Sequence, residues 1–279
     1  MSGQQVYIDH LLLQFNQEQF ETLPSWISDN FIVIDGGVHT GGLSRNKLIV
    51  FRDGTYLELY NWITKPEDWR KRLPGDFALT ALEPITPELS QQRIVKALAG
   101  VPGDGGIGVT YSPPQDGGRK NPGGEDVRWK IVKPAYSNAN STPSEEYYPR
   151  GRTDAPFFCH DVTPRSRRVT YELPSVTRHP SGATGIDSIE VLVPKGELRS
   201  YMDVYRSIVG APPHESQGTA EFRLNAPGVH SFSGSLRIRQ AETEADERFL
   251  REKGIGLSSL VLRSDSSQPI SFSIIDYLQ

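Results

Sequence analysis

The order of apolar and polar residues along residues 1–65 predicts four strands and one helix. Apolar runs bounded by Gly, Pro, Asn or Asp indicate strands, and apolar residues that recur at helical spacing indicate a helix. The helix is expected at residues 16–30, although Pro24 can shorten or break it. The strands are expected at residues 6–15 and 31–37 and in the two halves of residues 46–62, which Asp53 and Gly54 separate as a turn.

The same βαβββ order is expected twice more along the chain. The second round is a strand at 76–84, a helix at 86–100, and strands at 107–113, 127–137 and 155–162. The third round is a strand at 185–194, a helix at 195–210, and strands at 219–227, 234–242 and 256–264. Residues 113–126 and 137–154 are rich in Gly, Pro or polar residues, and we expect both segments to be loops.

A βαβββ unit cannot bury both faces of its own small sheet, so such units are expected to pair. We therefore predict an α+β fold in which repeated βαβββ modules form curved mixed sheets. Modules 1–65 and 76–165 are expected to pair and to carry the functional site, with helices on the convex side. Residues 183–279 are expected to form a third, degenerate module.

Composition limits the partners of the protein. A formal net charge of -4 over 279 residues argues against a nucleic-acid partner. The single cysteine, Cys159, excludes an intramolecular disulfide and suits a reducing compartment. The N-terminal sequence has no signal-peptide pattern, and no apolar run reaches the roughly 20 residues that span a bilayer. We therefore expect a cytoplasmic monomer or homodimer that binds a small molecule and no membrane.

Glu58 is an unusual residue for the middle of a predicted strand. In the sequence YLELYN it lies on the same strand face as Tyr56 and Tyr60, because strand side chains alternate between the two faces. Glu is depleted in strands and is almost never buried without a partner. We therefore expect Glu58 to contact a cation, either a metal ion or an arginine such as Arg128.

Histidines on neighbouring predicted strands favour the metal ion. If YLELYN is aligned with FFCHDV so that Tyr56 matches Phe158, then His160 takes the position of Glu58. His10 lies on the first predicted strand. Two histidines and one carboxylate suit a divalent transition metal with open positions, such as Zn, Ni, Mn or Fe(II). The predicted metal ligands are therefore His10, Glu58 and His160.

Five segments resemble one known superfamily. They are DHLLL at 9–13, GGVHTGGLSRNKL at 36–48, YLEL at 56–59, APFFCHD at 155–161 and RHPSGATGI at 178–186. Together they resemble the vicinal oxygen chelate superfamily, and within it the proteins with a glyoxalase-like domain. The resemblance implies paired βαβββ modules and a divalent metal, with His10 and Glu58 at the usual positions of two metal ligands.

The sequence departs from the family pattern at three places. The family usually takes a further ligand from the first strand of the second module, where this chain has no His, Gln or Glu before Glu83. Close relatives more often carry a carboxylate where this chain has His160. In the third module Ser188 aligns with His10, and the last strand has no carboxylate, so we expect this module to bind no metal.

The remaining candidate residues are expected to surround the metal. His39 and Asn46 match the family pattern GGxH…N, and His39 and Glu58 are candidates for moving a proton, although His39 and Asn46 can also simply fix the glycine-rich turn. His179 can contribute to the site or organise a turn. The predicted substrate-binding residues are Tyr56, Tyr60, Asn46, Arg128 and Phe158.

Two classes of function follow from this site. The first is a metal-dependent isomerase, lyase or ring-opening enzyme whose small substrate chelates the metal through two neighbouring oxygens. With Fe(II), dioxygenation would also fit. The second is a metal-free protein that binds a small molecule on the same scaffold, with Glu58 paired to a cation. In that case the binding surface would be lined by Tyr56, Tyr60, Trp129 and Phe158.

Overall fold

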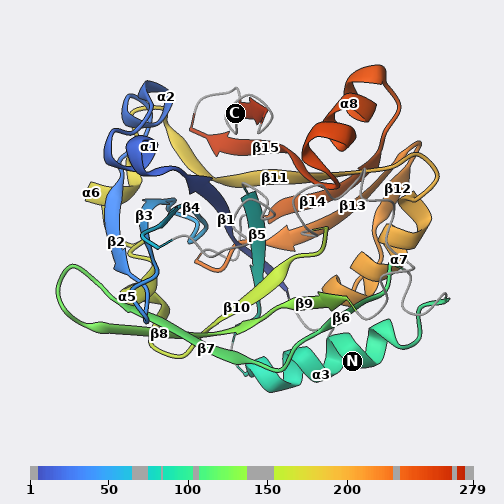
Figure 1. Ribbon diagram of the computed structural model, residues 1–279, viewed down its shortest axis with the longest axis horizontal. Helices are drawn as coiled ribbons and strands as arrows, with labels where there is room; N and C mark the ends of the chain where they lie inside the picture. The colour runs from blue at the N-terminus through green and yellow to red at the C-terminus, as the bar shows by residue number, and fades with distance from the viewer. Residues whose placement is uncertain are drawn as a thin grey trace.

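A computed structural model of the chain describes residues 6–64, 75–82, 84–102, 107–136, 154–228, 233–265 and 269–273. Glu83 and most of the polar loop predicted at 137–154 lie outside these residues. The described residues form an α+β fold with a 14-stranded mixed sheet, a separate two-stranded sheet and a few helices (Figure 1). Within the described part of the chain, none of the helices combines the length and the apolar character that crossing a membrane requires.

The first repeat forms the four predicted strands, but its helix is divided in two. Asn16 caps the first short helix, and Pro24 precedes the second, because proline cannot donate the backbone hydrogen bond that a continuous helix needs. The elements are β1 (Tyr7–Phe15), α1 (Gln17–Glu21), α2 (Ser25–Ser28), β2 (Ile34–Val38), β3 (Ser44–Val50) and β4 (Tyr56–Trp62).

The second repeat corrects one prediction. The loop expected at 113–126 contains a strand at 115–120, which pairs with the strand that begins at Asp126. Its glycines have a packing role, because a Cβ at Gly117 would lie 2.2 Å from Nε1 of Trp129 on the neighbouring strand. The elements are β5 (Gly75–Thr80), α3 (Pro87–Leu98), β6 (Val109–Tyr111), β7 (Gln115–Lys120), β8 (Asp126–Val132), β9 (Pro134–Tyr136) and β10 (Phe157–Asp161).

The third repeat follows two short helices, α5 (Arg165–Arg168) and α6 (Pro174–Thr177). It contains one helix that the apolar pattern did not predict, α8, which Thr243 and Asp246 begin with a capping box. The elements are β11 (Ala183–Val193), α7 (Leu198–Val209), β12 (His214–Ser216), β13 (Thr219–Asn225), β14 (Ser233–Gln240), α8 (Glu244–Lys253), β15 (Gly256–Ser264) and β16 (Ile270–Ser273).

One pairing order recurs three times in the described strands. In the first repeat β4 pairs in parallel with β1, and β3 and β2 follow outward. In the second repeat β10 pairs in parallel with β5, and β8 and β7 follow. In the third repeat β14 pairs in parallel with β11, and β13 and β12 follow, so the last strand of this repeat is β14 and not the predicted strand at 256–264, which pairs antiparallel with β11 as β15. The exact module boundaries at 1–65, 76–165 and 183–279 remain a prediction.

The first two repeats form a nearly closed barrel. β1 and β5 pair antiparallel and join the repeats in the order β2-β3-β4-β1-β5-β10-β8-β7. The outer edges of this sheet then meet, because His39 forms a β-bridge with Arg119 and the Thr40 amide donates to the Gly118 carbonyl at 2.8 Å. The sheet therefore has an inner face and an outer face.

Alternating residues divide between these two faces. Leu11, Leu57, Phe77 and Phe158 point outward and are fully buried in the main hydrophobic core, to which α3 and α7 also contribute. Their chain neighbours, which include His10 and Glu58, point inward. The inner face is therefore where the predicted site must be sought.

Candidate functional site

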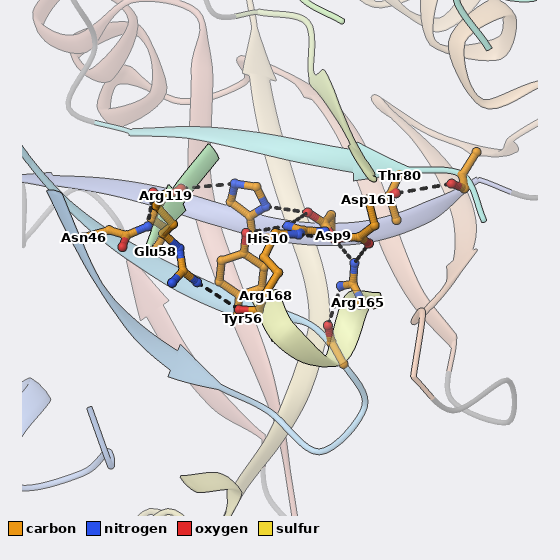
Figure 2. Close-up of polar contacts among 12 residues, drawn as sticks. Asp9, His10, Asn46, Tyr56, Glu58, Thr80, Arg119, Asp161, Arg165 and Arg168 are labelled. Carbon is orange, nitrogen blue, oxygen red and sulfur yellow. Dashed lines mark hydrogen bonds and ion pairs between the residues drawn. The ribbon is translucent and has the colours of Figure 1, made fainter. Parts of the chain in front are cut away.

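The inner face of β4 carries Tyr56, Glu58 and Tyr60. Because β1 runs parallel to β4 with His10 opposite Tyr56, the imidazole of His10 lies against both Tyr56 and Glu58. The His10 and Tyr56 rings stack with centroids 4.5 Å apart, and His10 Nε2 lies 3.3 Å from Glu58 Oε2 (Figure 2). Glu58 is therefore a buried carboxylate in direct contact with an imidazole.

A β-bulge brings Asp9 to the same imidazole. The register between β1 and β5 shifts between Ile8 and His10, so that Asp9 is the extra residue of the bulge. Asp9 is fully buried, and its Oδ2 lies 2.7 Å from His10 Nδ1. His10 thus lies between two carboxylates, Asp9 at Nδ1 and Glu58 at Nε2.

The other oxygen of Glu58 faces a second histidine. His39 Nε2 lies 3.5 Å from Glu58 Oε1, and Asn46 Nδ2 donates to the same oxygen at 2.8 Å. Asn46 can approach because residue 36 is glycine, where a Cβ would lie 2.0 Å from Asn46 Oδ1. His39 Nδ1 in turn lies 2.9 Å from Ser44 Oγ. The GGVH segment therefore positions both His39 and Asn46 around Glu58.

Aromatic rings flank both histidines in the same way. His10 stacks on Tyr56 and meets the edge of Phe157, with ring centroids 5.4 Å apart. His39 stacks on Tyr60 at 5.6 Å and meets the edge of Trp129 at 5.9 Å. Each histidine therefore has one stacked tyrosine from β4 and one edge-on ring from the second repeat.

Two arginines after β10 surround Asp9. Arg168 donates to both Asp9 oxygens, at 2.8 and 3.1 Å, to Asp161 and to the Tyr56 hydroxyl (Figure 2). Arg165 adds a 2.7 Å contact with Asp9 Oδ1. The sequence pattern does not indicate these arginines, because a segment such as RSRR is usually exposed to solvent. The signal for them was the Asp-His pair on a buried strand, since a buried carboxylate requires a cation.

These contacts determine the charges of the site. Burial alone would raise the pKa of Glu58, but His10, His39 and Asn46 lower it to about 2. Burial alone would lower the pKa of His10, but its contacts with Asp9 and Glu58 outweigh burial and raise it. Burial lowers the pKa of His39, and the charge of Glu58 only partly offsets this effect. Burial opposes the ionised form of Asp9, but Arg168 and Arg165 hold its pKa well below the usual value.

The predicted alignment of His160 with Glu58 is wrong by one residue. In the parallel pair of β5 with β10, Phe157 lies opposite Ala78, as Tyr56 lies opposite His10 in the first repeat. Cys159 therefore takes the position of Glu58, and a shift of one residue turns His160 to the outer face.

On the outer face His160 has few polar contacts. It stacks on Phe158, with centroids 5.8 Å apart, and neither of its ring nitrogens makes a well-aligned hydrogen bond in the described residues. The backbone of Ala81 lies near enough to favour the protonated ring, but burial outweighs this effect and lowers the pKa of His160. His160 is therefore a core histidine and lies away from Glu58.

Two predicted substrate-binding residues also lie away from the inner face. Phe158 is fully buried in the main core, where it meets the edge of Tyr111. Arg128 is exposed, because its neighbours Val127 and Trp129 occupy the inner face of β8. Besides Arg165 and Arg168, the buried arginine Arg119 lies close to the site and donates to the carbonyls of Gly36 and Arg168.

His179 has a structural position. Its Nδ1 accepts the Ile32 amide at 3.0 Å, and its Nε2 donates to the Val50 carbonyl at 3.0 Å. The edges of Phe31 and Phe51 pack against the ring. His179 therefore joins the segment before β2 to the end of β3, as in the turn-organising alternative.

The equivalent positions of the other repeats offer fewer metal donors. The second repeat has Ala78 and Cys159, and burial raises the pKa of the Cys159 thiol. The third repeat has Ser188 and Arg237. Within the described ranges, no group of three or more His, Cys, Asp and Glu residues is arranged to hold a metal ion. His10 and Glu58 are therefore the two predicted donors that the fold brings into contact.

Comparisons with known proteins agree with the fold. The model of the glyoxalase-like domain family matches residues 8–201. No curated protein matches the chain. A hypothetical protein from Staphylococcus aureus has a similar structure, with a TM-score of 0.63, 14% identity and coverage of 96% of each chain.

Two further structures are more distant. One is a mutant of 4-hydroxymandelate synthase from Streptomyces coelicolor, with a TM-score of 0.48, 15% identity, and coverage of 95% of this chain and 72% of that chain. The other is a fusion of a xylose isomerase-like TIM barrel with a 4-hydroxyphenylpyruvate dioxygenase, with a TM-score of 0.45, 10% identity, and coverage of 95% and 37%. Since the family model spans well over half of the sequence, the chain belongs to the glyoxalase-like domain family.

Proposed function

We propose that this protein is a glyoxalase-like enzyme that binds one divalent metal ion through His10 Nε2 and Glu58 and acts on a small substrate with two neighbouring oxygen atoms. The supporting observation is the contact between these two groups. Asp9 Oδ2 lies 2.7 Å from His10 Nδ1, so a neutral ring that donates from Nδ1 directs its Nε2 lone pair at the Glu58 carboxylate, at 3.3 Å. Two acceptors at this distance repel unless a cation lies between them.

A proton or a metal ion can supply that cation. The contacts with Asp9 and Glu58 raise the pKa of His10 and so favour a proton when no metal is bound. The donor chemistry also fits a metal ion, because metal-binding histidines usually donate their other N–H to a carboxylate, as His10 does to Asp9. Two protein donors leave several positions for a chelating substrate. A bound ion would supply Lewis-acid stabilisation of a developing oxyanion.

The chain's own residues would supply proton transfer. His39 is the candidate base, because burial favours its neutral form and its Nε2 lies beside Glu58 Oε1. Asn46 holds the Glu58 carboxylate, and Tyr60 and Trp129 shield His39 from water. Transfer of a proton between neighbouring atoms of the substrate would be an isomerisation, whereas proton removal followed by cleavage of a bond to a neighbouring group would be a lyase or ring-opening reaction.

Elemental analysis of protein purified without chelator or added metal tests the metal site. We expect about one divalent ion per chain in the wild type and a large loss in Glu58→Gln, which keeps the shape of the side chain and removes its charge. Glu88→Gln, on helix α3 outside the barrel, is the matched control and should retain the metal. If neither the purified protein nor protein dialysed against Zn²⁺, Mn²⁺ or Co²⁺ holds an ion, the metal part of the proposal is wrong.

Proton transfer can be measured separately from metal content. Hydroxyacetone, a small molecule with neighbouring hydroxyl and carbonyl oxygens, should exchange its carbon-bound protons with D₂O faster in the presence of the wild type, as followed by ¹H NMR. His39→Gln should slow this exchange by about 10²–10⁴-fold, the usual contribution of a general base. Equal exchange rates with wild type and His39→Gln would remove His39 from the proposed reaction.

A metal-free binding protein is the second candidate. It is favoured by the direct contacts of His10 and Asn46 with Glu58, which stabilise the carboxylate without a metal ion. Under this proposal Tyr60, Trp129 and Phe157 would hold the ligand. The protein would then contain no metal, and its Trp fluorescence would respond to a ligand equally in the presence and absence of EDTA.

A further inference from the structure

We propose that Asp9 is a positioning residue that fixes neutral His10 in the form protonated at Nδ1, and that Arg168 holds Asp9 in place for this task. The inference deepens the proposed function, and its metal readout depends on that function. Asp9 is on the bulge of β1, whereas Arg168 is on α5, after the last strand of the second repeat. The second repeat would thus control a histidine of the first repeat.

The two carboxylates around His10 have unequal contacts. Asp9 Oδ2 lies 2.7 Å from Nδ1, a short charge-assisted distance, whereas Glu58 Oε2 lies 3.3 Å from Nε2. When the ring carries one proton, the shorter contact keeps that proton on Nδ1. The Nε2 lone pair then remains directed at Glu58.

Arg168 contacts both groups that orient the imidazole. Its Nη1 donates at 2.8 Å to Asp9 Oδ2 and at 2.8 Å to the hydroxyl of Tyr56, whose ring stacks on His10. Its Nε donates to Asp161 at 2.6 Å. Every one of these groups is buried or partly buried, so the guanidinium has little freedom to move. Asp9 is therefore fixed by the same guanidinium that holds the tyrosine stacked on His10.

Replacement of Asp9 by asparagine should reverse this arrangement. The arginines occupy both oxygens of Asp9, with Arg165 and Arg168 on Oδ1 and Arg168 on Oδ2. Oδ1 has two arginine contacts and Oδ2 only one, so the amide oxygen of Asp9→Asn would take the Oδ1 position, and its NH₂ group would take the Oδ2 position beside His10 Nδ1 at the loss of one Arg168 contact. The ring would then accept at Nδ1 and carry its proton at Nε2, which removes the lone pair that faces Glu58.

¹⁵N NMR of histidine-labelled, metal-free protein tests the tautomer directly, at a pH where the His10 ring is neutral. The wild type should be protonated at Nδ1, and Asp9→Asn should be protonated at Nε2. Affinity for Co²⁺, measured by titration calorimetry, should fall by about 10–100-fold in Asp9→Asn, as is usual when the group that orients a metal-binding histidine is lost.

Asp161→Asn is the matched control. It removes a carboxylate from the same arginine, but Asp161 has its contacts with Arg165 and Arg168 rather than with His10. This variant should keep the Nδ1 tautomer and wild-type Co²⁺ affinity, whereas a general loosening of the arginine cluster would change both variants alike.

The outcomes separate this inference from the proposed function. If wild-type His10 is protonated at Nε2 when neutral, the inference is overturned, and this measurement needs no variant to fold. The same holds if Asp9→Asn folds and keeps the Nδ1 tautomer. If the wild type has the Nδ1 tautomer that Asp9→Asn reverses but binds no Co²⁺, the positioning role of Asp9 stands and the metal proposal fails.

Discussion

His10 on β1 and Glu58 on β4 face each other across two parallel strands, and Nε2 of the one lies 3.3 Å from Oε2 of the other. The contact explains why a glutamate can occupy the middle of a buried strand. Its carboxylate is stabilised by the imidazole of His10, which a second carboxylate, Asp9, contacts at Nδ1. The stabilisation of its charge therefore depends in part on the protonation of His10, beside the contributions of His39 and Asn46. The first prediction follows from this dependence.

Metal-free protein should lose stability as the pH rises above the pKa of free histidine. The pKa of His10 is raised in the folded state, so its contribution is fully present below the unfolded value of about 6.5 and is lost as the pH rises through the folded pKa. Urea unfolding in EDTA between pH 6 and 9 should show this loss in the wild type and not in His10→Gln. If the free energy of unfolding changes with pH in the same way in both proteins, the prediction that folded His10 is protonated is wrong.

Gly36→Ala should act on Glu58 through Asn46. A Cβ at position 36 would lie 2.0 Å from Asn46 Oδ1, so the side chain of Asn46 must move and lose its 2.8 Å bond to Glu58. A hydrogen bond to a charged group is worth about 1.5–3 kcal/mol, and we expect a destabilisation of this size in urea unfolding.

A double-mutant cycle identifies the route of this effect. Asn46→Ala should have a similar cost, and Gly36→Ala should add little in the Asn46→Ala background. Gly100→Ala is the control, since a Cβ there meets only the Ala97 carbonyl, at 3.4 Å. If the stability losses of Gly36→Ala and Asn46→Ala are strictly additive, Gly36→Ala acts through the backbone and not through the contact of Asn46 with Glu58.

His179 should make the fold sensitive to acid. Burial lowers its pKa, and protonation of Nδ1 would break the bond from the Ile32 amide. A depressed histidine pKa means that the unfolded chain takes up the proton first, so stability should fall as the pH drops below about 6.5 and level off below the folded pKa.

Thermal or urea unfolding between pH 8 and 5 checks this effect. His179→Gln should reduce the acid-dependent loss, although it should be less stable than the wild type at pH 8. His214→Gln, at an exposed position on β12, should follow the wild-type curve. An unchanged acid-dependent loss in His179→Gln would assign the pH dependence to other groups.

Much of the fold could be predicted because strands with one buried face have a period of two that survives sequence divergence. The pattern failed at β7, where Gly117 and Gly118 indicate a loop, but Gly117 leaves room for Trp129 and Gly118 leaves room for the Val127 carbonyl. It also failed at α8, whose charged surface hides its few apolar residues. The failure at β7 arises where tertiary packing outweighs local preference, whereas at α8 the local signal is the capping box of Thr243 and Asp246, which an apolar pattern does not detect.

The site was predictable in part for a related reason. His39, Asn46 and Glu58 lie within one repeat, where strand alternation gave the face of Glu58 and the resemblance to the family pattern gave His39 and Asn46. Arg168 reaches Asp9 from 159 positions away, and no local pattern indicates such a contact. Strand alternation gives no register between repeats. Because FFCHD begins with two adjacent phenylalanines, the sequence alone did not decide whether Phe157 or Phe158 matches Tyr56, and the predicted alignment was wrong by one residue.

The register of β10 predicts that substitutions of His160 and His10 have different effects on metal content and stability. His160 points to the outer face, stacks on Phe158 and has no well-aligned hydrogen bond to either ring nitrogen in the described residues, whereas His10 points inward to Glu58. His160→Phe should therefore leave metal content unchanged and keep or raise stability by about 1 kcal/mol, because a buried polar ring without well-aligned partners is costly.

His10→Phe is the matched substitution on the inner face. It should abolish metal retention and remove the pH-dependent contribution described above, since Glu58 then loses the imidazole that stabilises its charge. Elemental analysis and urea unfolding of the two variants, side by side, decide between the registers. Loss of the metal in His160→Phe with retention in His10→Phe would restore His160 as the ligand and show that β10 presents its other face to the barrel interior.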